Sequence, residues 1–416
     1  MLWSPQQDRA LREVSAFMAD PDRQVFYLAG YAGTGKTTLA RTFAEGIEGS
    51  VCFAAFTGKA AYVLRQKGCP GATTIHSLIY ISREKSKAAL TEMKEALAEL
   101  LQDLHMENRH EELYVPDEDS RVQELKRRIN EEEKALARPM FVLNPDSPVR
   151  SASLVIIDEC SMVDETIGED LLSFGTKILV LGDPGQLPPV YGTGYFTSRK
   201  PDMVLTEIHR QAAESPILWM ATRARLGESI PLGRYGTSNV ILQRDVDVKH
   251  HVLGCGQILV GKNATRQDSN VRVRQLRWFQ NAPYTPYPIA GDRLVCLRNN
   301  HETGLLNGAI WSVVRAGDPV DETIGIMVSP EDNGPDVYVT SHTHYFEKRG
   351  DKLPWWQKKD AEEFDYGYAL TAHKAQGSQW DDVLLFDESH VFRENRNKWL
   401  YTAITRAADS LTLVRL

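Results

Sequence analysis

Eight residues near the N-terminus carry the most specific chemical signal in this chain. They read Gly30-Tyr31-Ala32-Gly33-Thr34-Gly35-Lys36-Thr37 and fit GxxxxGK[ST], a pattern whose glycines let backbone N–H groups turn toward phosphates. Lys36 can reach the terminal phosphates, and the Thr37 hydroxyl can ligate Mg²⁺. The pattern predicts a nucleotide site whose binding residues are Gly33, Thr34, Gly35, Lys36, Thr37 and Thr38.

Two carboxylates end an apolar run further along the chain. Leu154 to Ile157 is followed directly by Asp158 and Glu159. At the end of a buried strand, Asp158 can hold Mg²⁺ and Glu159 can orient an attacking water. This pair predicts metal-assisted hydrolysis of the bound nucleotide.

A turn rich in proline follows the next apolar run, 178–181. It reads GDPGQLPPV over residues 182–190 and places Gln186 where open parallel sheets bind ligands. Gln186 can contact a γ-phosphate or its attacking water. Taken alone, such a turn is as often only a turn.

These residues need a parallel sheet to bring them together. Apolar runs at 25–29, 51–56, 154–157 and 178–181, with helical patterns from residue 37 and from about residue 59, predict an α/β lobe. Similar runs at 257–260, 293–297, 366–370, 383–386 and 411–414, with a helical pattern near 263–279, predict a second lobe.

Two segments interrupt this alternation. Apolar residues at three- and four-residue steps from Leu90 to Leu104 and from Val122 to Leu136 predict two amphipathic helices, either a solvated hairpin or a binding surface. Short β-rich runs within 305–347 predict a small barrel. The expected domains are lobe one at 1–80 and 150–211, a helical insertion at 81–149, lobe two at 212–300 and 361–416, and a β insertion at 301–360.

Composition excludes some classes of protein. With 42% hydrophobic and 25% charged residues, the chain is expected to fold around more than one core, and no apolar stretch approaches the roughly 20 residues that span a bilayer. Five cysteines without any CxxC predict neither a disulfide framework nor a zinc site. A net charge of −8 does not exclude a nucleic-acid groove, because charge need be favourable only there. We expect a cytoplasmic protein.

A series of further motifs resembles superfamily 1 helicases, most closely the RecD/Dda-like branch. In order, the matching segments are GYAGTGKT, AFTGKAA within 54–61, TTIHS at 73–77, IIDECSM at 156–162, GDPGQLPPV, LTEIHRQ at 205–211, YALTAHKAQGSQW at 368–380 and YTAITRA at 401–407. The resemblance implies two RecA-like P-loop lobes, an SH3-like β insertion in lobe two, and a bacterial or phage-infected cell as the setting.

The resemblance also implies roles for residues around the nucleotide. Gln7, the second of two adjacent glutamines, resembles the residue that recognises adenine with an amide that donates and accepts. Arg210 and Arg406 resemble two arginines that reach the γ-phosphate as charge develops in the transition state. Together with Lys36, Glu159 and Gln186, these arginines form the predicted catalytic set.

Further positions resemble the family's contacts to a single strand. They are Phe56, Thr57, Lys59, Thr73, Thr74 and His76 in lobe one, and Thr371, His373 and Gln376 in lobe two, with Lys374 as a further candidate. Many relatives have Pro where this chain has Phe56, so its ring either stacks on a base or points into the core. The family's strand-separating hairpin has no obvious counterpart, because only about 140–150 remains for an extended element.

The implied function is an ATP- and Mg²⁺-dependent DNA helicase that moves 5' to 3' on single-stranded DNA and opens duplex junctions. We expect a monomer without membrane contact, with replication or recombination proteins as candidate partners. Three alternatives stay open: a translocase subunit that unwinds only with a partner, an RNA helicase, and a DNA-binding adaptor that does not hydrolyse ATP. Strand displacement by the isolated chain, a nucleic-acid preference assay and an ATPase assay separate them.

Overall fold

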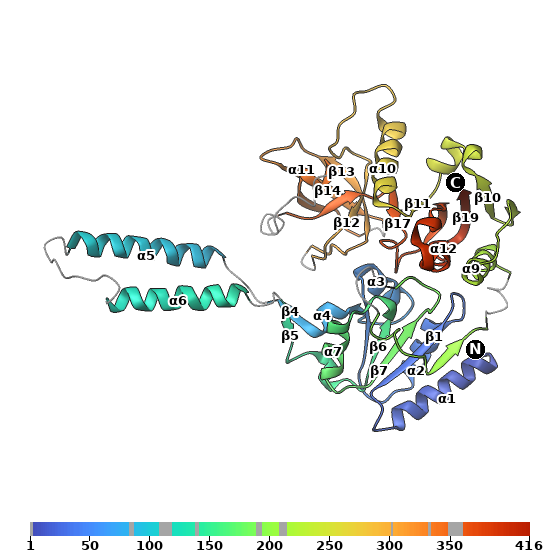
Figure 1. The fold of residues 1–416 in the computed structure, drawn as a ribbon, viewed down its shortest axis with the longest axis horizontal. Coiled ribbons are helices and arrows are strands. Elements are labelled where there is room, and N and C mark those ends of the chain that lie inside the picture. Colours follow the sequence, from blue (N-terminus) through green and yellow to red (C-terminus); the bar gives the residue numbers. More distant parts are fainter. Residues whose placement is uncertain are drawn as a thin grey trace. The chain divides into compact units, whose positions relative to one another are not determined.

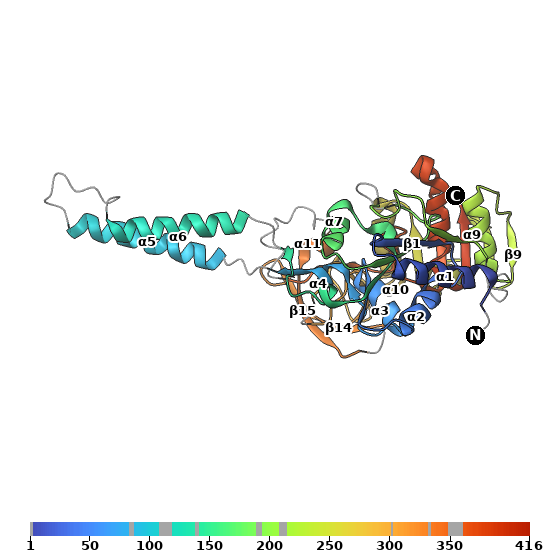
Figure 2. The ribbon, with the colours of Figure 1, turned by 90° about the horizontal axis from the view of Figure 1, so that it is seen from below.

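The computed structural model describes residues 3–82, 87–107, 119–137, 141–188, 194–207, 214–300, 303–331, 334–347 and 361–416. The chain divides into two compact units, one of residues 1–78 and 148–416 and the other of residues 79–147. Figures 1 and 2 show the ribbon. No helix in these described ranges is long and apolar enough to cross a membrane.

A six-stranded parallel sheet forms the first lobe of the larger unit. Its order is β3-β2-β6-β7-β1-β8. The strands are Val25–Gly30 (β1), Val51–Ala55 (β2), Thr73–Thr74 (β3), Leu154–Asp158 (β6), Ile178–Gly182 (β7) and Met203–Leu205 (β8). The helices are Pro5–Ala19 (α1), Lys36–Glu45 (α2), Gly58–Gln66 (α3), Ile75–Ile79 (α4) and Glu165–Ser173 (α7). The strands and helices predicted for this lobe are confirmed.

A second six-stranded sheet forms the other lobe, in the order β17-β11-β18-β19-β10-β9. It is parallel except for the edge pair β9 and β10. The strands are Gly233–Tyr235 (β9), Ser238–Leu242 (β10), Gln257–Val260 (β11), Ala369–Thr371 (β17), Trp380–Phe386 (β18) and Ala407–Arg415 (β19). The helices are Pro216–Leu226 (α9), Asn263–Trp278 (α10) and Arg396–Ile404 (α12).

A five-stranded antiparallel sheet is inserted into lobe two, in the order β15-β14-β13-β12-β16. Its elements are Arg293–Cys296 (β12), Ile310–Ala316 (β13), Thr323–Pro330 (β14), Val337–His342 (β15), Thr343–Phe346 (α11) and Phe364–Tyr366 (β16). Arg274 of α10 and Asp292 beside β12 are both fully buried and form an ion pair of 2.9 Å. This pair ties the sheet to lobe two.

Two strand assignments for lobe two were wrong. The run 293–297 was expected in the parallel sheet, but β12 pairs antiparallel with β13 and β16. The run 366–370 was expected to be one strand, but it is divided between β16 and β17 at Gly367, where an added Cβ would lie 3.0 Å from the Leu294 backbone. Apolar runs show burial without showing the partner strand, so the β insertion extends beyond both ends of the expected 301–360.

The smaller unit contains the predicted pair of helices. They are Lys87–Glu107 (α5) and Ser120–Ala137 (α6), which lie side by side and antiparallel (Figures 1 and 2). Leu104, Val122 and Ile129 are buried between them. Tyr80–Ser82 (β4) pairs antiparallel with Phe141–Leu143 (β5) at the open end of the hairpin. The extended element expected within 140–150 is therefore one strand of a two-stranded ribbon.

Candidate functional site

The phosphate loop connects the buried strand β1 to helix α2. Gly33 and Gly35 both have φ of +79°, a left-handed conformation that residues with a Cβ rarely adopt. Gly35 caps α2 without any side-chain hydrogen bond to the helix N–H groups. Because these N–H groups and the positive end of the helix dipole coincide, the loop is suited to an anion.

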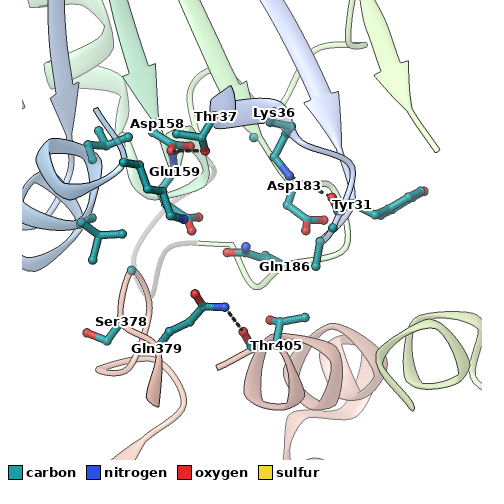
Figure 3. Close-up of a pocket in the computed structure, with 18 of the residues that line it drawn as sticks. Tyr31, Lys36, Thr37, Asp158, Glu159, Asp183, Gln186, Ser378, Gln379 and Thr405 are labelled. Carbon is teal, nitrogen blue, oxygen red and sulfur yellow. Dashed lines mark hydrogen bonds between the residues drawn. The ribbon is translucent and has the colours of Figure 1, made fainter. Parts of the chain in front are cut away.

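Lys36 is the first residue of α2, and its ammonium group lies over the loop. Its Nζ donates to the carbonyl oxygens of Gly30 and of Tyr31, the latter at 3.2 Å. Figure 3 shows the Lys36 side chain beside Asp183 and Tyr31. The ammonium is thus held at the loop, where a terminal phosphate of a bound nucleotide would meet it.

Thr37 and Asp158 form the candidate metal position. The Thr37 Oγ1 donates to Asp158 Oδ2 at 3.1 Å, and Asp158 Oδ1 accepts from the Glu159 backbone N–H at 2.9 Å. Removal from water and the nearby Glu159 raise the pKa of Asp158, while Lys36 opposes this shift. A hydroxyl and a carboxylate are the hard oxygen donors that Mg²⁺ prefers, so the pair fits this ion.

Glu159 has an unusual backbone that directs its side chain. Its φ is 54° and its ψ is 45°, a left-handed conformation that is uncommon for non-glycine residues and is often found at active sites. The side chain extends into the space between the loop and the second lobe (Figure 3). A carboxylate in this position can orient a water molecule toward a terminal phosphate.

A cavity of about 320 Å³ lies between these residues and the second lobe. The predicted residues lining it are Gly33, Gly35, Lys36, Thr37, Thr38, Asp158, Glu159, Gln186 and Arg406. Gly377, Ser378, Gln379 and Thr405 also line it from lobe two. The structure thus brings together most of the predicted nucleotide set.

Two polar side chains in this wall, those of Gln186 and Arg406, can form further hydrogen bonds to a bound ligand. Gln186 is buried, and its Oε1 accepts no hydrogen bond from the described residues. Arg406 is 5% exposed and donates to the carbonyl oxygens of Thr402 and Ser378 and to Thr405 Oγ1. Among the described residues the guanidinium binds only neutral oxygens, so its charge suits a phosphate.

Two of the described residues predicted for the nucleotide site, Thr34 and Gln7, do not line this cavity. Thr34 is buried behind the loop, where its Oγ1 donates to the Tyr31 carbonyl at 2.8 Å. Gln7 is 3% exposed, donates to the Thr34 carbonyl at 3.1 Å and completes a capping box with Ser4. Both residues therefore brace the loop, and adenine recognition by Gln7 stays a prediction. Arg210 lies outside the described residues.

A second cavity, of about 450 Å³, lies between the two lobes and beside the β insertion. Five of the residues predicted to contact a strand line it: Phe56, Thr57, Lys59, His373 and Gln376. Lys374, Met162, Asp164, Val295, Leu297 and Asn307 also contribute to its walls. We call this cavity the strand groove. Its mixture of aromatic, apolar and cationic side chains suits stacked bases and a phosphate backbone.

The other four predicted strand contacts do not line the strand groove. His76 does not line it, but its ring packs against Phe56 edge to face at 6.1 Å between centroids. Thr74 and Thr371 are buried, and their hydroxyls accept from the backbone N–H groups of Ser77 and Lys374. Thr73 is half-buried in the short strand β3. Of these residues, His76 and Thr371 contact residues that line the groove, namely Phe56 and Lys374.

Burial makes both histidines weak bases. It lowers the pKa of His373 and of His76 from the usual 6.5, although Asp164 opposes the shift at His76. Both imidazoles are therefore neutral at pH 7, and they offer hydrogen bonds and ring surface instead of charge. Lys59 is half-buried, with its ammonium 5.2 Å from the Tyr62 ring centroid, and remains a cation of the groove.

Sequence reasoning missed several residues of the two cavities. Asp183 and Tyr401 lie within quoted motifs but have no role among the predicted site residues, and they form a hydrogen bond of 2.6 Å at the nucleotide cavity. Asn307 lines the strand groove from the β insertion. No local pattern marks Asn307, because its proximity to Phe56 arises from the packing of distant segments.

Comparisons with known proteins agree with this arrangement. A family model described as an AAA domain matches residues 3–243, and one described as a UvrD-like helicase C-terminal domain matches residues 366–414. The ATP-dependent RecD2 DNA helicase of Deinococcus radiodurans is 29% identical over 281 residues. That match covers 62% of this chain, and the chain spans only 35% of the RecD2 length.

Solved structures share the fold. A Pif1 helicase in a study of unwinding at forked double-stranded DNA matches over 99% of this chain and 92% of its own, with 17% identity and a TM-score of 0.53. The Bacteroides Pif1 helicase in complex with ADP-AlF3 and ssDNA matches over the same shares, with 16% identity and a TM-score of 0.51. The core is therefore RecA-like and similar to that of the RecD2 and Pif1 helicases, and the chain belongs to the family described as an AAA domain, with a C-terminal segment that matches a UvrD-like helicase domain.

Proposed function

We propose that this chain is an ATP-dependent DNA helicase motor that translocates 5' to 3' on single-stranded DNA and opens duplex junctions. The observation that carries the proposal is the pair of cavities shared by the same two lobes. One presents a phosphate loop, three carboxylates and a buried arginine, and the other presents aromatic, hydroxyl and cationic groups. The RecD2 relative and its printed activity support the choice of DNA.

The residues of the nucleotide cavity divide the chemistry between the lobes. Lys36 and the loop N–H groups hold the phosphates, and Glu159 with Gln186 orients the attacking water. Arg406 meets the charge that develops on the transferred phosphoryl group from the side of lobe two. Thr37 and Asp158 would hold Mg²⁺, which would supply positive charge to neutralise the phosphates when bound.

Arg406 makes hydrolysis depend on the approach of the two lobes. A γ-phosphate that contacts both Lys36 and Arg406 favours the closed arrangement, and its loss after hydrolysis releases that preference. The strand groove is formed by the same lobes, so closure and release change the grip of Phe56 and His373 on a strand. Alternating grip moves the motor along DNA.

The experiment that tests the proposal measures ATP hydrolysis by the purified chain with and without a single-stranded oligonucleotide. The same preparation is given duplexes with either a 5' or a 3' single-stranded tail. We expect strong stimulation by DNA and strand displacement from the 5' tail. Lys36→Ala should lose hydrolysis and displacement while it still binds the oligonucleotide, which shows that the variant is folded.

Each of the other outcomes would indicate a different function for this chain. Stimulation without displacement from either tail would indicate a translocase that needs a partner. Displacement from the 3' tail alone would overturn the polarity. Stimulation by RNA in preference to DNA would assign an RNA motor, and DNA-stimulated hydrolysis retained by Lys36→Ala would overturn the site itself.

A further inference from the structure

A tyrosine of lobe two reaches into the phosphate loop of lobe one. Tyr401 lies on α12 and is 2% exposed. Its hydroxyl donates to Asp183 Oδ2 at 2.6 Å and accepts from the Ala32 backbone N–H at 2.8 Å. One phenol therefore joins the loop that holds the phosphates to the turn that follows β7.

The turn is shaped to receive this ring. Asp183 Oδ1 accepts from the Gly185 N–H at 2.9 Å, which folds the turn beneath the carboxylate. A Cβ added at Gly185 would lie 2.9 Å from Tyr401 Cε1, closer than side chains normally approach. Only a residue without a side chain leaves room for the ring at this place.

The next residue of α12 holds the other end of the same turn. Thr402 Oγ1 accepts from the Leu187 N–H at 2.9 Å. Two consecutive side chains of lobe two thus fix the turn on both sides of Gln186. Arg406 follows four residues after Thr402 and donates to its carbonyl oxygen. The phosphate loop, the Gln186 turn and Arg406 are therefore all held in place by contacts to Tyr401 and Thr402, near the C-terminal end of α12.

The burial of both groups explains why the Tyr401 phenol is the donor and the Asp183 carboxylate is the acceptor. Burial raises the pKa of Tyr401 far above neutral pH, so the phenol stays protonated and can donate. Burial also raises the pKa of Asp183, while Lys36 and the Tyr401 hydrogen bond oppose the shift. A buried carboxylate that loses its donor is costly, so the turn and α12 favour being docked together.

We propose that Tyr401 is a positioning residue that sets the phosphate loop and the Gln186 turn into their hydrolytic arrangement when α12 docks on lobe one. This inference rests on the proposed ATP hydrolysis and adds the element that aligns it. Tyr401 touches no reacting atom, because it acts through Ala32 and Asp183. Its loss should slow the chemical step more than it weakens nucleotide binding.

The test compares Tyr401→Phe with Tyr366→Phe. Tyr366 is a buried tyrosine of β16 whose hydroxyl donates to the Pro286 carbonyl at 2.6 Å, so its variant loses a similar hydrogen bond away from both cavities. We expect kcat of Tyr401→Phe to fall about tenfold with KM for ATP within about threefold of wild type. Tyr366→Phe should keep both constants, and the thermal unfolding temperature of both variants should fall.

Gly185→Ala provides a second variant that keeps the hydroxyl. Its methyl group displaces the Tyr401 ring, so kcat should again fall while KM is retained. The inference is overturned if kcat of Tyr401→Phe stays within about twofold of wild type, or if the loss lies entirely in KM. If DNA did not stimulate ATP hydrolysis by the wild-type chain, the proposed motor function would be overturned. The ratio of variant to wild-type kcat would still test the role of Tyr401.

Discussion

The side-chain amide of Gln376 lines the strand groove and donates from Nε2 to the carbonyl oxygen of Leu187, 3.3 Å away. Leu187 ends the turn that carries Gln186 into the nucleotide cavity, and its own N–H is held by Thr402. Gln376, which would contact the strand, is therefore joined by one hydrogen bond to the turn whose Gln186 would contact the γ-phosphate. This hydrogen bond is a direct physical connection between the two cavities.

Gln376→Ala should uncouple DNA binding from ATP hydrolysis. Removal of the amide breaks the bond to Leu187, so we expect the ratio of DNA-stimulated to unstimulated kcat to fall about tenfold. The dissociation constant for a single-stranded oligonucleotide should change by less than about threefold, because the other groove residues remain. Steady-state hydrolysis and fluorescence anisotropy measure the two quantities.

Gln24→Ala is the matched control for this prediction. The Gln24 amide also donates to backbone carbonyls, those of Leu172 and Thr176, and it lies outside both cavities. It should keep normal stimulation. If Gln376→Ala lost oligonucleotide affinity in proportion to its loss of stimulation, Gln376 would be a strand ligand and not a coupling residue.

Glu159→Gln should bind ATP and stall before hydrolysis. The substitution keeps the size of the side chain but removes the charge that orients and activates water, a loss of about 10²- to 10⁴-fold in kcat. Nucleotide affinity should be retained, because Lys36 and the loop N–H groups are untouched. Single-turnover hydrolysis measures the effect, and Glu165→Gln, at the exposed start of α7, should leave the rate unchanged.

The prediction of Glu159 from sequence shows which features a linear pattern can reveal. The phosphate loop, the carboxylate pair and the flanking strands depend on neighbouring residues, so their types and spacing predicted the elements that position them. The partner of β12 did not follow in this way. Its apolar residues fit a parallel or an antiparallel sheet equally well, and only the pairing with β13 and β16 decides between them.

The groove residues show the same limit at the level of side chains. Phe56 and His373 were predicted through motifs and do line the groove, whereas Thr74 and Thr371, from equally strong motifs, are buried and bind the backbone. A threonine in a motif can cap a turn or face a ligand, and the sequence does not distinguish these roles. Tyr401 and Asn307 were missed because their partners are distant in the chain.

Phe56 should supply stacking energy for a bound strand. Its ring is half-buried, lines the strand groove and is held edge to face by His76. Loss of a stacked base costs about 1–3 kcal/mol, so Phe56→Ala should weaken oligonucleotide binding by about 5- to 150-fold. Fluorescence anisotropy with a labelled single strand measures this change.

Phe56→Leu separates stacking from simple packing. Leucine retains an apolar side chain of similar reach but has no ring face. Affinity near that of Phe56→Ala would support stacking, whereas affinity near wild type would show that the position needs only an apolar side chain. Unfolding midpoints of both variants close to wild type would exclude a general loss of structure.

Lys59 and His373 should differ in how salt affects their contribution to strand binding. A cation that neutralises a phosphate releases counterions, so Lys59→Ala should reduce the slope of log K against log salt by about 0.7. His373 is neutral at pH 8, because burial lowers its pKa below 6.5. His373→Asn should therefore weaken binding at pH 8 while it leaves the slope unchanged.

At acid pH, His373 should affect the salt dependence of strand binding as Lys59 does. The direction of this change follows from the lowered pKa of His373. As pH falls through the folded-state value, below 6.5, the imidazole gains a proton and its wild-type salt slope steepens relative to His373→Asn. The unfolded chain takes up that proton first, so the free energy of unfolding should fall as pH drops from 6.5 toward the folded-state value. Salt titrations in steps from pH 8 down to the lowest pH at which the chain stays folded, with urea unfolding at the same pH values, test both effects. Equal slopes for wild type and His373→Asn at acid pH would show that the imidazole does not meet the phosphate backbone.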